Sequence, residues 1–76
     1  MSIEGVSLSA SSVALLALRL ARAGHSTLAQ RLGVAVDRNI EAISLLPGEK
    51  TKVLAVLDDA PDALRPLRDA LVQLRR

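Results

Sequence analysis

Short apolar segments precede longer stretches of helical periodicity at two places in the chain. Residues 3–8 have the composition of a short strand, and from Ala10 to Ala23 apolar side chains recur at intervals of three and four residues. After a break at Gly24, which suits the end of a helix, a second amphipathic stretch runs from Thr27 to about Asp37. The first half of the chain therefore predicts one strand followed by two helices.

The second half repeats this order. Ile43-Ser44-Leu45 predicts a second strand, and Pro47 occupies a position suited to the first residue of a third helix. A fourth helix begins at Asp62 or at Pro66. We therefore expect one mainly α domain over residues 1–76, with about four helices and two very short strands, in which the order strand-helix-helix is repeated twice.

The two halves also share a short sequence. Glu4-Gly5-Val6-Ser7-Leu8 returns as Glu41-Ala42-Ile43-Ser44-Leu45, 37 positions later. If this reflects a duplication, the units are residues 1–38 and 39–76, and the two serine-containing strands are natural partners for each other. The alternative is that two strand-to-helix entries look alike because such entries share the same capping chemistry. The sequence supports these two interpretations equally.

Composition adds a prediction about association. Half of the residues are apolar, but the chain has no Phe, Tyr, Trp or Cys. A small domain without aromatic residues, disulfides or a structural metal is most easily stabilised by burying a face against a second copy or a partner. The first helix is apolar over most of its circumference, so we expect it to supply the interface of a homodimer. The predicted interface residues are Val13, Leu16, Ala17 and Leu20, with Arg19 and Arg22 on the rim.

Charge and hydropathy restrict the compartment and the partners. The formal net charge is only +2, which is small for a protein that binds nucleic acid through a basic surface. The apolar run 13–18 is far shorter than the roughly 20 residues that span a bilayer, and Glu4 stands where a signal peptide would carry basic residues. We therefore expect a cytoplasmic protein with no membrane partner.

Residues that could carry chemistry are few and scattered. His25 is the only histidine, and the acidic group Asp58, Asp59 and Asp62 flanks a proline between two helices, where aspartate is favoured as a helix terminator and cap. No phosphate-binding glycine loop or nucleophile elbow is present in the sequence. We expect no enzymatic activity, no cofactor, no metal and no small-molecule substrate.

One segment resembles a known family. Thr27-Leu28-Ala29-Gln30-Arg31-Leu32-Gly33-Val34 is similar to the first helix and turn of helix-turn-helix DNA-binding regulators. The resemblance implies a turn at Gly33 and a recognition helix over residues 35–43. The DNA contacts would then come from Arg31, Arg38 and Asn39. The alternative, which we favour, is one uninterrupted helix that tolerates Gly33.

The strand-helix-helix order also resembles that of ribbon-helix-helix repressors, which dimerise through paired strands that read DNA. The corresponding strands here, Val6-Ser7-Leu8 and Ile43-Ser44-Leu45, carry no Arg or Lys. The sequence therefore favours a non-enzymatic helical module that self-associates and acts by binding another protein. The alternative is a DNA-binding transcriptional regulator of either type.

Overall fold

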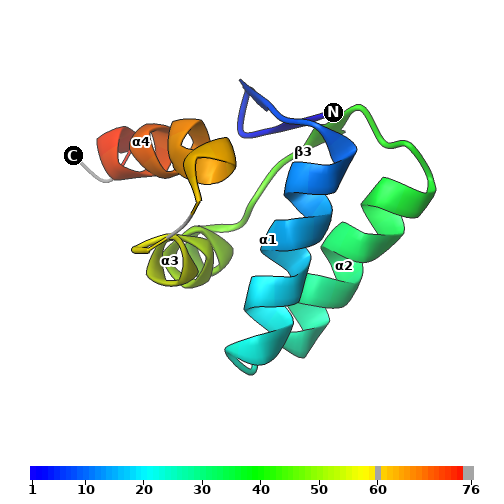
Figure 1. Cartoon of the computed structure of the whole chain (residues 1–76), viewed down its shortest axis with the longest axis horizontal. Coiled ribbons are helices and arrows are strands. Elements are labelled where there is room, and N and C mark those ends of the chain that lie inside the picture. The colour runs from blue at the N-terminus through cyan, green and yellow to red at the C-terminus, as the bar shows by residue number, and fades with distance from the viewer. Residues whose placement is uncertain (60, 75–76) are drawn as a thin grey trace.

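The structure is a computed structural model that describes residues 1–59 and 61–74. Its elements, in chain order, are β1 (Ser2–Ile3), β2 (Val6–Ser7), α1 (Ala10–Arg22), α2 (Ser26–Asp37), β3 (Ala42–Ile43), α3 (Pro47–Val56), a 3-10 turn η1 (Asp62–Leu64) and α4 (Arg65–Leu74). The predicted class, mainly α with very short strands, is confirmed. Figure 1 shows α1 and α2 side by side, with α3 and α4 on the other side of the extended segment that contains β3.

The strands form a sheet whose topology differs from the predicted pairing. The strand order is β2-β1-β3, with β1 antiparallel to β2 and parallel to β3. Residues 3–8 are therefore not one strand, and the two serine-containing segments do not pair with each other. The reason is a tight turn at Glu4 and Gly5, whose φ angles of 51° and 80° fold the chain back on itself. As a result, β1 lies between β2 and β3, whereas the repeat predicted that the two serine-containing segments would pair directly.

Helix α2 runs without interruption from Ser26 to Asp37. Gly33 lies inside this helix, and the residues on either side of it along the inner face, Leu32 and Ala35, are both buried. The chain leaves the helix only at Asn39, where φ is 53°, and then enters β3. The turn implied at Gly33 is not formed and residues 35–43 are not a recognition helix, so the backbone expected from the helix-turn-helix resemblance is wrong.

The core draws side chains from all the helices and from the sheet. Val13, Leu16 and Leu20 of α1 are each 0% exposed, and α2, α3 and η1 all contact this helix. The accessible surface of the chain is 4698 Å², close to the roughly 4,450 Å² expected for a folded monomer of this mass. The predicted intermolecular face is therefore wrong for these three residues, because the chain covers them itself. Ala17, beside them, is half-buried.

Candidate interaction site

A groove of about 530 Å³ lies between α2 and β3, and we call it the α2–β3 groove. One wall comes from the outward turns of α2, and the other comes from β3 and the residues that flank it. The lining residues are Thr27, Gln30, Arg31, Val34, Ala35, Ile40, Ala42, Ile43 and Ser44. The groove is therefore built by two consecutive elements, which the four residues 38–41 connect.

The middle of the groove is apolar. Val34 and Ile40 are each 41% exposed and are two of the four large hydrophobic side chains that stand out to solvent in the described ranges. Ala35 and Ile43 lie buried behind them. Two exposed aliphatic side chains in one concave surface lose contact with water only when something covers the groove. This surface is therefore the strongest candidate for binding in the part of the chain that the structure describes.

The groove also borders a free edge of the sheet. The backbone of Ile43 faces β1, where its carbonyl accepts a bond of 3.0 Å from the Glu4 N–H. Because backbone groups alternate sides along a strand, those of Ala42 and Ser44 face away from β1. Both residues line the groove. An unpaired strand edge of this kind is a template for another extended chain.

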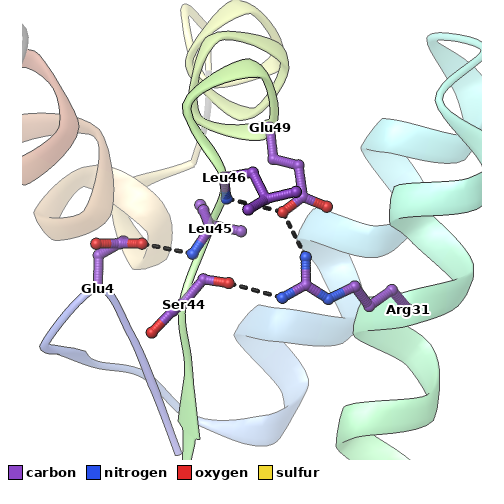
Figure 2. Close-up of polar contacts among 6 residues, drawn as sticks. All are labelled: Glu4, Arg31, Ser44, Leu45, Leu46 and Glu49. Atoms are coloured by element: carbon purple, nitrogen blue, oxygen red, sulfur yellow. Dashed lines mark hydrogen bonds and ion pairs between the residues drawn. The ribbon is translucent and has the colours of Figure 1, made fainter.

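Arg31 closes one end of the groove. Its Nη2 donates to the Ser44 carbonyl over 2.7 Å, and its Nη1 pairs with the Glu49 carboxylate. The same carboxylate accepts the Leu46 N–H over 2.9 Å, which is one half of a capping box at the start of α3. We call this arrangement the Arg31 clasp, and Figure 2 shows it reaching from α2 across to the start of α3.

The extended segment is also held from its other side. Figure 2 shows Glu4, from the N-terminal hairpin, directed at the Leu45 N–H, which donates to its carboxylate. Lys50 lies 3.8 Å from the second oxygen of Glu4. The backbone at residues 44–46 is therefore fixed between the hairpin and α2. The clasp and Glu4 together keep the edge of β3 in a defined position beside the groove.

The clasp makes the stability of the fold depend on pH. The hydrogen bond from Arg31, followed by the Leu46 backbone N–H, lowers the pKa of Glu49 from its ordinary value of 4.5. A carboxyl whose pKa is lowered by folding stabilises the fold fully at pH values above its pKa in the unfolded chain. This stabilisation is lost as the pH falls through its pKa in the folded chain. Glu49→Gln keeps an acceptor for Leu46 but removes the charge. We expect this variant to lose about 1 kcal/mol at pH 7 and nothing near pH 2.

Thermal unfolding followed by circular dichroism between pH 2 and pH 7 measures this difference. Glu41→Gln is the matched control, because the Glu41 carboxylate makes no hydrogen bond or ion pair in the described part of the chain. Equal pH dependence in Glu49→Gln and the wild type would show that the clasp contributes no charge-dependent stability.

The predicted DNA contacts lie along α2 and in the turn that follows it. Arg31 belongs to the clasp, whereas Arg38 and Asn39 lie exposed in the turn after α2. Asn39 has a left-handed backbone, with φ at 53°, and lies where the chain leaves α2. It is therefore not part of a helix that could contact base edges. The recognition helix that would present Arg38 and Asn39 to a DNA groove is therefore not formed.

The predicted rim residues of α1 lie in a second, smaller depression of about 410 Å³, which we call the α1–α3 crease. Arg19 and Arg22 line it with Leu15, Leu18, Ala23, Val56 and Asp59. Leu18 is 48% exposed, and Arg19 Nη1 lies 3.3 Å from Asp59 Oδ1. The exposed apolar part of α1 is therefore this side of the helix, about half a turn away from the predicted face.

Chemistry-bearing groups stay separate in the fold. Within residues 1–59 and 61–74, no three His, Cys, Asp or Glu side chains are grouped so that they could hold a metal ion. His25 is half-buried at the start of α2 and makes no side-chain capping bond. No helix in those ranges is long and apolar enough to cross a membrane.

Comparison with protein-family models, with curated proteins and with solved structures finds no match to this chain. Any function proposed for this chain therefore rests on the geometry of the two depressions. The sequence contained one sign of the groove. Val34 lies on the outer side of α2 with Thr27, Gln30 and Arg31, where an isolated amphipathic helix would place a polar residue.

Proposed function

We propose that this chain is a non-enzymatic interaction module that binds another protein through the α2–β3 groove. The observation that carries the proposal is the position of Val34 and Ile40, both half-exposed, in one groove beside the free edge of β3. Concave, largely apolar surfaces with a few polar groups are where proteins bind ligands. The continuous course of α2 through Gly33 supports this function over DNA recognition.

The two exposed side chains of the groove make a limited contribution to the free energy of binding. Fully burying a Val or Ile side chain stabilises by roughly 1.5–3 kcal/mol, so covering the exposed part of both residues contributes about 2 kcal/mol. Association costs at least about 4 kcal/mol in lost translational and rotational freedom. Burial of these two side chains alone is therefore too weak, and the partner must add buried surface of its own or bonds to the polar groups of the groove.

Selection from a displayed library of random nine-residue peptides tests the proposal. We expect the wild type to select peptides that bind at micromolar concentrations. Ile40→Asp should weaken them at least tenfold, because a carboxylate in the groove must lose its water when the peptide docks. Leu18→Asp is the matched control, since Leu18 is a similarly exposed aliphatic residue outside the groove. Isothermal titration gives the dissociation constants.

Two results would contradict the proposal. The first is that no peptide is enriched on the wild type. The second is that Ile40→Asp and Leu18→Asp weaken the selected peptides equally. Circular dichroism spectra of both variants establish that they keep the fold, so that a loss of binding reports on the groove alone.

We also propose that two copies associate through the α1–α3 crease. The centre of the crease is apolar, and its rim carries both signs of charge, with Arg19 and Arg22 on α1 and Asp59 after α3. In a twofold arrangement the same patch meets itself, so a basic rim can face an acidic one. The arginines of one copy would therefore face Asp59 of the other, which supports a second copy of the chain as the partner at the crease.

Sedimentation equilibrium tests this association. Leu18→Glu should turn the assembly into a monomer without unfolding it, because the substituted side chain points to solvent in the single chain. Ser11→Glu, another exposed position of α1 outside the crease, should leave the assembly unchanged. A wild type that stays monomeric at 100 μM, or a Leu18→Glu variant that still associates, would remove the crease as an interface.

A further inference from the structure

We propose that the α2–β3 groove receives an extended segment of a partner protein as a fourth strand beside β3, with an apolar side chain in register with Ile43 and an acidic side chain toward Arg31. This inference rests on the proposed function of the groove and specifies the ligand. It follows from an inventory of the backbone groups on the free edge, from the clasp, and from the charges near it.

The free edge offers a small and defined set of backbone groups. Along β3, the Ala42 N–H, the Ala42 carbonyl and the Ser44 N–H face away from β1. The fourth group, the Ser44 carbonyl, already accepts a bond from Arg31. Two donors and one acceptor are therefore available to a ligand along this edge.

This set fits a parallel strand. A ligand residue in register with Ile43 would donate its N–H to the Ala42 carbonyl and accept the Ser44 N–H at its own carbonyl. The ligand carbonyl two residues earlier would accept the Ala42 N–H. All three available groups are then used, and the ligand N–H two residues later is directed at the Ser44 carbonyl, which also accepts the bond from Arg31.

An antiparallel strand uses the same backbone groups. If one ligand residue forms the paired bonds with Ala42, the N–H two residues before it is directed at the Ser44 carbonyl. That carbonyl is held by Arg31 at 2.7 Å. In either direction one ligand N–H therefore shares this acceptor with the guanidinium, and a carbonyl oxygen has two lone pairs for two donors. The edge accepts a strand of either direction.

Side chains of the ligand follow from the same register. Neighbouring residues in a sheet place their side chains on the same face, so the residue beside Ile43 faces the buried side, toward the α2 wall. Val34 and Ala35 lie in that wall. An aliphatic side chain would cover the apolar surface that is exposed in the free protein.

Charge determines the other end of the ligand. Arg31 lies at one end of the groove, where Lys50 and Lys52 lie near the carboxylates of Glu4 and Glu49. Three cations and two anions leave this end of the groove positive. An acidic side chain at this end of the ligand would therefore be attracted.

A second copy of the folded chain does not suit this site. The groove lies between α2 and the free edge of β3, so each copy carries its own α2 beside the edge that would have to pair. Bringing two β3 edges together would bring both helices into the same space. A single extended segment without an attached helix enters without this conflict.

The experiment uses the full chain and one nine-residue peptide from the displayed library. This peptide is the one with the highest affinity for the wild type among those that the Ile40→Asp variant fails to bind. Hydrogen exchange followed by NMR should show the amides of Ala42 and Ser44 slowed at least tenfold in the complex. N-methylation at each peptide position in turn should weaken binding at least tenfold at one position, and less than threefold at the neighbours on either side. Replacing the acidic peptide residue by its amide should weaken binding about threefold at low salt.

A nitroxide on the peptide determines how the peptide lies along the edge. Attached beside the acidic residue, it should broaden the amide signals of residues 44–46, and attached at the opposite end of the peptide, those of residues 40 and 41. The reverse pattern, or unprotected amides at Ala42 and Ser44 in a complex that still depends on Ile40, would overturn the added strand and leave the groove intact as a binding site. If no peptide depends on Ile40, the proposed function itself fails.

Discussion

Replacing Leu16 by alanine is expected to lower the free energy of unfolding by about 3 kcal/mol. Leu16 is 0% exposed and belongs to the continuous core that joins α1 to the other helices and the sheet. Its removal leaves a cavity that the surrounding side chains fill only in part. A chain of this length has a total stability of roughly 4–11 kcal/mol, so the variant loses a large share of it.

The measurement is chemical denaturation followed by circular dichroism, supported by thermal melting. A loss of about 3 kcal/mol corresponds to a fall of roughly 12–24 °C in melting temperature for a domain of this size. Leu18→Ala, two residues along α1 on its opposite side, changes a side chain that is 48% exposed; it is the matched control and should lose less than about 1 kcal/mol. A stable Leu16→Ala variant with altered association would instead place Leu16 on an outer face.

Replacing Glu4 by alanine should cost about 2 kcal/mol. The Glu4 carboxylate accepts the half-buried Leu45 N–H and lies 3.8 Å from Lys50 Nζ, so it joins the N-terminal hairpin to the start of α3. Hydrogen bonds to a charged group contribute roughly 1.5–3 kcal/mol. Alanine keeps the left-handed φ of 51° without these contacts, so the difference reports on the contacts rather than on the turn.

Glu4→Gln separates the hydrogen bond from the charge. Glutamine retains an acceptor for the Leu45 N–H and loses only the attraction to Lys50, so it should cost less than about 1 kcal/mol. Urea denaturation at pH 7 gives both values. If the glutamine and alanine variants are equally destabilised, the bond to Leu45 contributes nothing and the interaction is purely one of charge.

Local signals in the sequence were sufficient for the helices. Ser9 caps α1 by accepting the Ser12 N–H over 3.2 Å, Gly24 follows its end with φ at 90°, and Pro47 opens α3. Each of these depends on a few neighbouring residues, which is why the class and the order of elements were predicted. Pairing of the strands depended on a turn with Glu at its first position, a residue that rarely adopts positive φ.

The interaction site was harder to predict because it depends on which surfaces remain uncovered. The apolar circumference of α1 looked too wide for one small chain, but α2, α3 and η1 together cover Val13, Leu16 and Leu20. Val34 and Ile40 are six residues apart in sequence, yet they meet as one surface only because β3 returns beside α2. No periodicity in a sequence encodes that return.

The central place of β1 also constrains the order of folding. Pairing Ile3 with Ile43 closes a loop that contains all of α1 and α2. Closing a long flexible loop costs more entropy than closing a compact one, so the sheet forms most readily once the two helices have packed together. Helical hairpins are rich in local contacts and assemble quickly, whereas contacts across 40 residues are slow. The edge that borders the groove is therefore among the last parts of the molecule to take shape.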